Sequence, residues 1–184
     1  MGSLQIGVPL DPAELADRHA ITELLHYHSR ALDRCDAELM KAVYWSDAEV
    51  DYGGFKGKAH DFAPLVMQSL GAQYQLTQHR ITNTVMARVN TDQIHTESYC
   101  FAKHLAADGT EEMLYTGRYL DQFSKREGAW KFQHRCVVMD WSRRLSVTDE
   151  RDQGSFAALT KGNNTERDPS FDHLGDLGLV LNLL

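Results

Sequence analysis

Apolar residues near the start of the chain recur at helical spacing. Four of them fall on one face of a helix: Ile21, Leu24, Leu25 and Leu32. His28 lies within the same stripe, so its side chain is expected to point inward. The helix should begin after Asp11, with Pro12 in its first turn, because Asp caps a helix and Pro is tolerated in the first turn. The pattern predicts a long amphipathic helix from residue 12 that ends near Asp33.

Shorter elements follow this helix. Residues 37–43 and 60–70 have helical patterns, and Pro64 falls in the first turns of the second of these segments, where proline is tolerated. Between them, residues 49–52 are typical of a strand, and Gly53-Gly54 provides a turn into a returning strand at 55–58. The chain therefore begins with helices and one hairpin.

The periodicity changes from Thr77 onward, where β-branched and aromatic residues dominate. Turn signals separate four long antiparallel strands, expected at roughly 77–89, 93–105, 111–124 and 129–145. Helices followed by such a sheet indicate an α+β fold in which the helices cover one face. A strongly bent sheet closed by helices forms a cone, and its interior is the expected apolar pocket for a small molecule.

The length of 184 residues fits one domain with a substantial core. We expect a leader at residues 1–11, the folded domain at 12–146 and a C-terminal extension at 147–184. The extension ends in an apolar run from Leu174 to Leu184, which would be a liability if exposed. It is expected to pack on the domain or on a neighbouring subunit, and the alternative is a disordered tail.

Charge and cysteine content exclude several classes of function. A net charge of -7 without a Lys/Arg cluster argues against a nucleic-acid partner. No apolar stretch approaches the roughly 20 residues that span a bilayer, and no export signal is visible, so we expect no membrane association. Three separated cysteines without CxxC spacing favour reduced thiols and a cytoplasmic location.

Cofactor and metal motifs are missing from the sequence. It contains no phosphate loop, no nucleophile elbow and no dinucleotide fingerprint. His26 and His28 form an H-x-H pair, but on a helix their side chains diverge by about 200°. We therefore expect neither a metal site nor an organic cofactor.

His79 is the main candidate for catalytic chemistry, with Asp33 as its partner. An imidazole titrates near the pH of the cell, and a carboxylate on its other nitrogen fixes the tautomer and stabilises the protonated ring. Two purely structural interpretations compete with this one. His79 could be a structural histidine, and Asp33, about 120° from Ile21 around the helix, could be a helix-end carboxylate.

Four segments occur in an order that is known from one protein family: Leu32-Asp33, Val50-Asp51-Tyr52, Thr77-Gln78-His79 and Gly128-Ala129-Trp130-Lys131-Phe132. On these segments, residues 12–146 resemble the SnoaL-like branch of the nuclear transport factor 2-like (NTF2-like) superfamily. This branch includes scytalone dehydratase, hexachlorocyclohexane dehydrochlorinase and bile acid dehydratase. The resemblance implies a cone-shaped fold and eliminations that need no metal or organic cofactor.

The resemblance also implies roles for individual residues. Asp33 and His79 match the catalytic Asp and His, and Tyr52 matches a water-orienting Tyr. His28 occupies the position, five before the helix-end Asp, where the dehydrochlorinase carries a Lys and the bile acid enzyme a Tyr, and its place on the apolar stripe agrees with a role in the pocket. From the strands, three aromatic residues are expected to bind substrate: Tyr115, Tyr99 and Phe101.

One departure from the pattern concerns the second catalytic His of scytalone dehydratase. By the resemblance, that His would fall on the strand that here includes residues 113–118, where no His occurs. A scytalone substrate is therefore disfavoured, and His28 or Tyr115 could supply the second proton-transfer group.

The favoured hypothesis is a cofactor-independent lyase with a His-Asp general base and a small hydrophobic aromatic or polycyclic substrate. Dehydration, loss of hydrogen halide and formaldehyde loss from lignin-derived diaryl compounds all begin with one positioned base. Alternatives are an isomerase or cyclase, a ligand-binding module, and a non-catalytic small subunit of an aromatic-ring-hydroxylating oxygenase. Relatives are commonly dimers or trimers, so the resemblance implies a homo-oligomer.

Overall fold

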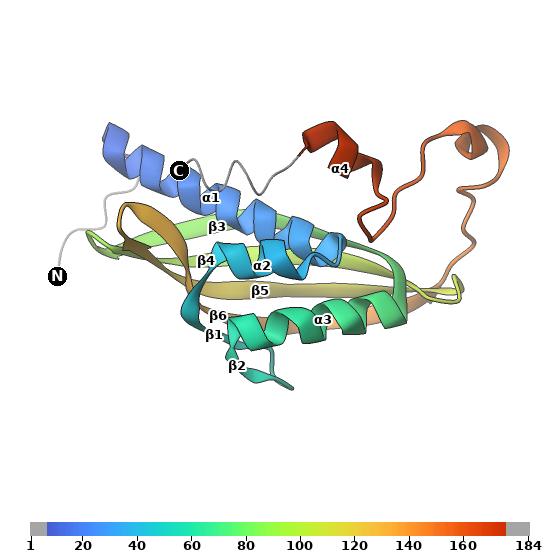
Figure 1. The fold of residues 1–184 in the computed structure, drawn as a ribbon, viewed down its shortest axis with the longest axis horizontal. Helices are drawn as coiled ribbons and strands as arrows, with labels where there is room; N and C mark the ends of the chain where they lie inside the picture. The colour runs from blue at the N-terminus through green and yellow to red at the C-terminus, as the bar shows by residue number, and fades with distance from the viewer. Residues whose placement is uncertain (1–6, 176–184) are drawn as a thin grey trace.

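The computed structural model describes residues 7–175 of the chain (Figure 1). Its helices are α1 (Pro12–Asp33), α2 (Ala37–Val43), α3 (Ala59–Gln73), the 3-10 helix η1 (Gly154–Ala158) and α4 (Pro169–Leu174). Its strands are β1 (Tyr44–Asp51), β2 (Lys56–Lys58), β3 (Tyr74–Asn90), β4 (Gln93–Ala106), β5 (Glu111–Arg126) and β6 (Ala129–Ser146). The predicted α+β class, with N-terminal helices and four long strands, is confirmed.

The six strands form one curved, unclosed sheet in the order β2-β1-β6-β5-β4-β3. Every neighbouring pair is antiparallel except β1 and β6, which run parallel. The four long strands are antiparallel as expected, and the parallel pairing of β1 with β6 is an addition that the sequence analysis did not predict. β3 forms one edge of the sheet. The helices α1, α2 and α3 all lie over the same face of the sheet (Figure 1).

The ends of α1 are set by local hydrogen bonds. Asp11 caps its start by accepting a hydrogen bond from the backbone N–H of Glu14 at 2.9 Å. The helix ends at a sharp turn, in which Cys35 adopts a left-handed φ of 49°. Asp36 then caps α2 through the backbone N–H of Leu39 at 2.8 Å. Asp33 is therefore the last residue of a helix that stops beside the sheet.

Alternation along β4 identifies the inner face of the sheet. Its even-numbered residues from 94 to 104 are all buried: Ile94, Thr96, Ser98, Cys100, Ala102 and His104. They face the helices, whereas the odd-numbered Tyr99 is 44% exposed on the opposite face. The apolar core lies between this inner face and the helices, and most of its buried residues come from α1, α2, α3 and β1.

A change of register between β5 and β6 alters which residues of β6 point inward. The register shifts between Gln122 and Phe123, so Phe132 and Arg135 are both fully buried although they lie three positions apart. Simple alternation along β6 would place only one of these two residues on the inner face. The structure places Arg135 on the inside.

The chain beyond β6 returns to α1. Arg30 in α1 donates a hydrogen bond to Ser170 Oγ in α4 at 2.9 Å, and Arg34 forms an ion pair with Asp168 at 3.2 Å. Figure 1 shows α4 beside the C-terminal end of α1. The apolar ending that we expected to pack on the domain falls mostly at 176–184, outside the described residues.

Within residues 7–175, no helix has the length and apolar character needed to cross a membrane. Over the same residues, no group of three or more His, Cys, Asp or Glu side chains is arranged to hold a metal ion.

Candidate active site

Asp33 and His79 are in direct contact. His79 Nδ1 lies 2.7 Å from Asp33 Oδ1, and the backbone N–H of His79 donates to both carboxylate oxygens at 3.1 and 3.0 Å. The hydroxyl of Thr77 donates a further hydrogen bond to Oδ1 at 3.2 Å. The side chains of His79 and Asp33 are 8% and 13% exposed. The structure thus brings together the pair that the sequence proposed.

The position of β3 at the edge of the sheet explains this contact. An edge strand has backbone N–H groups that point away from its single neighbour and need another acceptor. The end of α1 reaches that edge, so the Asp33 carboxylate accepts the outward N–H of His79 as well as the imidazole.

This arrangement selects one tautomer of His79. A carboxylate can only accept a hydrogen bond, so Nδ1 carries the proton that it shares with Asp33. Nε2 then carries a lone pair and is able to take a proton from a substrate. Among the described residues, Nε2 of His79 has no hydrogen-bond partner.

His104 in β4 lies next to His79 and was missed by the sequence analysis. The two ring centroids are 5.2 Å apart with an interplanar angle of 87°. His104 is buried, and its Nδ1 has no hydrogen-bond partner in the part of the chain that the structure describes. Burial and the neighbouring His79 lower the pKa of His104 to about 4, so the ring is neutral near pH 7.

His104 is a second histidine beside His79 that the sequence analysis did not propose, since it named His28 or Tyr115 for a second proton-transfer group. It lies on β4, one strand closer to β3 than residues 113–118 of β5. The alternation of β4 was a usable signal, because it places His104 on the same face as Cys100 and Ala102.

A buried cation occupies another part of the inner face. Arg135 forms a bidentate pair with Asp121, through Nε at 2.7 Å and Nη2 at 2.8 Å, and both side chains are fully buried. The guanidinium carbon lies 4.0 Å from the ring centroid of Tyr119. Although burial opposes the charge, Asp121 raises the pKa of Arg135 further above its ordinary value. The interior therefore contains a permanent positive charge paired with one carboxylate.

His28 and Tyr52 lie with Arg135 rather than with the Asp33–His79 pair. Arg135 Nη1 is 2.8 Å from His28 Nδ1 and 3.1 Å from Nε2, and the Tyr52 hydroxyl is 3.5 Å from His28 Nε2. Burial, and next the Arg135 charge, lower the pKa of His28 well below its ordinary value. Burial also raises the pKa of Tyr52, which keeps its hydroxyl protonated.

The three aromatic residues expected to bind substrate have different positions. Tyr115 lies on the inner face, and its hydroxyl donates to the backbone carbonyl of Val138 at 2.8 Å. Burial raises the pKa of Tyr115, so this hydroxyl holds its proton and is not a free acid. The structure does not bring Tyr99 or Phe101 to the His79 pair, because odd-numbered residues of β4 face away from the helices.

Two surface cavities adjoin Asp33. One, of about 270 Å³, lies between α1 and β3 and includes His79 in its lining, with His26, Ser29, Arg30, Asp33, Arg34 and Ile81. The other, of about 330 Å³, is bounded by β3, β4 and the C-terminal extension, which contributes Gly162 and Asn163. The Asp33–His79 pair is therefore reached from a groove beside α1.

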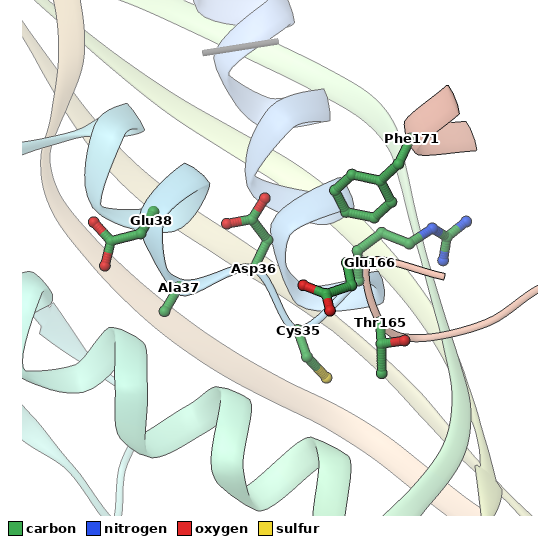
Figure 2. A pocket seen from close by; sticks show the side chains of 8 residues that line it. Cys35, Asp36, Ala37, Glu38, Thr165, Glu166 and Phe171 are labelled. Atoms are coloured by element: carbon green, nitrogen blue, oxygen red, sulfur yellow. The ribbon is translucent and has the colours of Figure 1, made fainter. Parts of the chain in front are cut away.

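A third cavity of about 350 Å³ lies where the extension meets the turn between α1 and α2 (Figure 2). Figure 2 shows Cys35, Asp36 and Glu38 on one side of it and Thr165, Glu166 and Phe171 on the other. Its lining includes three carboxylates and does not include His79. It is a junction between the extension and the domain, separate from the Asp33–His79 pair.

The comparisons with known proteins agree with this fold. The family model of the SnoaL-like domain matches residues 13–136. An uncharacterised protein of Mycobacterium tuberculosis is 28% identical over 130 residues, covering 68% of this chain and 87% of that protein. A γ-hexachlorocyclohexane dehydrochlorinase of Sphingobium indicum is 26% identical over 136 residues, covering 71% and 85%.

A solved structure shows the same fold at lower identity. A hexachlorocyclohexane dehydrochlorinase from Novosphingobium barchaimii superposes with a TM-score of 0.68 at 23% identity, covering 74% of this chain and 94% of the other. The family model spans α1 and reaches into β6, and thus includes Asp33, His79, His104 and Arg135. The chain belongs to the SnoaL-like domain family.

Proposed function

We propose that this protein is a lyase that catalyses an elimination, with His79 as the general base. The observation that carries the proposal is the 2.7 Å contact between His79 Nδ1 and Asp33, which leaves Nε2 as the basic nitrogen. The similarity to a dehydrochlorinase of the same family supports this reaction class. The chemistry needs only groups that this chain supplies.

In the proposed step, Nε2 of His79 removes a proton from a substrate carbon. The electron pair of that C–H bond forms a new carbon–carbon double bond, and the leaving group departs from the adjacent carbon with its bonding pair. Asp33 stabilises the imidazolium that forms, because its carboxylate faces Nδ1 directly. Negative charge that develops on the substrate is favoured by the buried positive charge of Arg135.

The nature of the leaving group decides whether a second proton is needed. A chloride departs as an anion, whereas a hydroxyl leaves readily only when it receives a proton. His104 is neutral and lies beside His79, so its ring can donate a hydrogen bond to a departing hydroxyl, while the proton that leaves with the hydroxyl as water comes from the His79 imidazolium formed in the first step. The structure supports His104 for this role better than Tyr115, whose hydroxyl is occupied by Val138.

The substrate that fits best is small and hydrophobic. The inner face beside His79 carries buried or half-buried apolar groups, which include Ile81, Cys100, Ala102 and Tyr119. Apolar walls with a few positioned polar groups are typical of sites for such molecules. We therefore propose an aromatic, polycyclic or halogenated ring compound as the substrate class.

The test is a turnover screen of three substrate sets with the wild-type protein and His79→Ala. Chloride release is measured from γ-hexachlorocyclohexane, and loss of water or formaldehyde is measured by mass spectrometry on hydroxylated polycyclic and diaryl compounds. His95→Ala is the matched control, because His95 is an exposed histidine on the outer side of β4. We expect turnover in the wild type and the control and none in His79→Ala. Undiminished turnover in His79→Ala would refute the proposal.

Isomerisation is the second candidate, because the same base and a second histidine can move a proton between two carbons. His104 beside His79 is the observation that favours it. The screen separates the two reactions, since an isomerase changes the absorbance of its product without a change in mass. Binding of these compounds without turnover would favour a ligand-binding module or a non-catalytic subunit.

A further inference from the structure

His28 is a buried residue of α1 that has both aromatic and polar neighbours. Its side chain is completely buried on the inner face of the helix. Three aromatic rings surround it, those of Tyr44, Tyr119 and Phe132, with centroids 5.6 to 6.3 Å away. Its polar neighbours are Arg135 from β6 and the hydroxyl of Tyr52 after β1. No carboxylate among the described residues contacts the His28 ring.

The hydrogen bonds of Arg135 leave one part of its guanidinium for His28. Nε and Nη2 are both used by Asp121. Nη1 is the remaining nitrogen, and it lies within 3.1 Å of both nitrogens of the His28 ring. A guanidinium can only donate hydrogen bonds, so the His28 nitrogen that faces it has to be an acceptor and has to be unprotonated.

The charge balance of this cluster leads to the same result. Asp121 and Arg135 together are neutral, and the other groups that face His28 are the phenols of Tyr44, Tyr52 and Tyr119. A protonated His28 would add a second buried cation in contact with the first, with no carboxylate to balance it. The His79 ring also disfavours a positive charge on His28, because it lowers the pKa of His28.

We propose that His28 is a positioning residue that acts as a permanent neutral acceptor for Arg135. Together with Asp121 it holds the guanidinium over the Tyr119 ring, so that the buried positive charge has one fixed location in the site. This inference rests on the proposed function, and it replaces the proton-transfer role that the sequence suggested for His28. The fixed positive charge of Arg135 favours, at this end of the site, a substrate group that gains negative charge during the reaction.

The first test observes His28 directly and does not depend on any substrate. The protein is labelled with ¹⁵N-histidine, and the His28 signals are assigned by their loss in His28→Gln. We expect the signals of a neutral imidazole with an unchanged tautomer from about pH 5 to about pH 8, the range in which free histidine in the same buffer titrates. Titration of His28 within that range would overturn the proposal, whatever reaction the protein catalyses.

The second test compares three side chains on turnover of the substrate found in the screen. His28→Gln keeps a neutral acceptor, whereas His28→Leu has none, and folding of both is checked by circular dichroism. We expect His28→Gln to retain kcat within about threefold, and His28→Leu to lose about tenfold or more, because a donor of a buried cation is left unpaired. Both variants should keep the limb of the pH–rate profile that depends on His79.

The outcomes also separate this proposal from the proposed function. If His28 transfers a proton, His28→Gln and His28→Leu lose similar activity, on the order of 10²-fold or more, and one limb of the pH profile disappears. That result would overturn the positioning role and leave the role of His79 intact. Full activity in His28→Leu would also overturn it. Activity in His79→Ala would instead refute the general base and leave the NMR result on His28 standing.

Discussion

The carboxylate of Asp33 binds His79 at two places, the imidazole Nδ1 and the backbone N–H. The side-chain contact selects the tautomer, and the backbone contact fixes the point along β3 from which the side chain projects. One helix-end residue thus sets the protonation and the location of the proposed base.

Asp33→Asn is expected to abolish most of the activity while the protein remains folded. An amide can keep one hydrogen bond but carries no negative charge, so the imidazolium loses its counter-charge and the tautomer is no longer enforced. We expect kcat to fall by about 10³-fold or more, measured on the substrate found in the screen. Asp61→Asn, on an exposed residue of α3, is the control. A loss of less than tenfold would show that Asp33 serves structure alone.

Asp121→Asn is expected to destabilise the protein strongly, because it leaves the buried Arg135 without its counter-charge. Breaking such a pair typically costs about 3 to 5 kcal/mol, measured by urea denaturation. The double variant Asp121→Leu with Arg135→Met should recover much of that stability without recovering turnover. Recovery of turnover would show that the charge of Arg135 has no part in the reaction.

Gly117→Ala tests how closely the Tyr115 side chain and the Val138 backbone pack against Gly117. A Cβ at Gly117 would lie 2.2 Å from both the Tyr115 hydroxyl oxygen and the Val138 carbonyl oxygen. The carbonyl belongs to the backbone and cannot move freely, so we expect a loss of about 2 kcal/mol or more in the free energy of unfolding. Adding Tyr115→Phe should relieve only part of this loss. Complete relief would contradict the predicted clash with Val138.

Stability is expected to fall in mild acid because of His104. The unfolded chain protonates this residue near its ordinary pKa of 6.5, whereas the folded protein does so only at a pKa of about 4. The stability that its neutral form contributes is therefore fully present above about pH 6.5 and is lost progressively as the pH falls towards 4. Over that interval the loss is about 3 kcal/mol.

The measurement for this prediction is urea denaturation of the wild type and of His104→Gln at a series of pH values. The variant has no imidazole at this position and should show a smaller decline between neutral pH and mild acid. Equal declines in the two proteins would assign the acid sensitivity to other groups.

Much of the fold could be predicted because its signals are local. The cap at Asp11, the apolar stripe of α1 and the glycine turns between the long strands each depend on a few consecutive residues. The parallel pairing of β1 with β6 could not be predicted in this way, because it joins segments about eighty residues apart without a local signal.

The site was predicted where family resemblance was available and missed where strand geometry decided the result. The contact between Asp33 and His79 has no helical periodicity behind it, since Asp33 lies off the apolar stripe. Tyr99 and Phe101 were selected for their aromatic character, although side-chain alternation along β4 points them away from the inner face. Arg135 was ambiguous because the irregular register between β5 and β6 interrupts simple alternation.

The position of His79 on the edge strand has a consequence beyond chemistry. An exposed strand edge offers unpaired N–H groups to any other extended chain and is a common starting point for aggregation. Asp33 occupies one such group, the backbone N–H of His79, with a charged side chain. The same carboxylate that contacts the proposed base therefore also protects the open border of the sheet against strand addition.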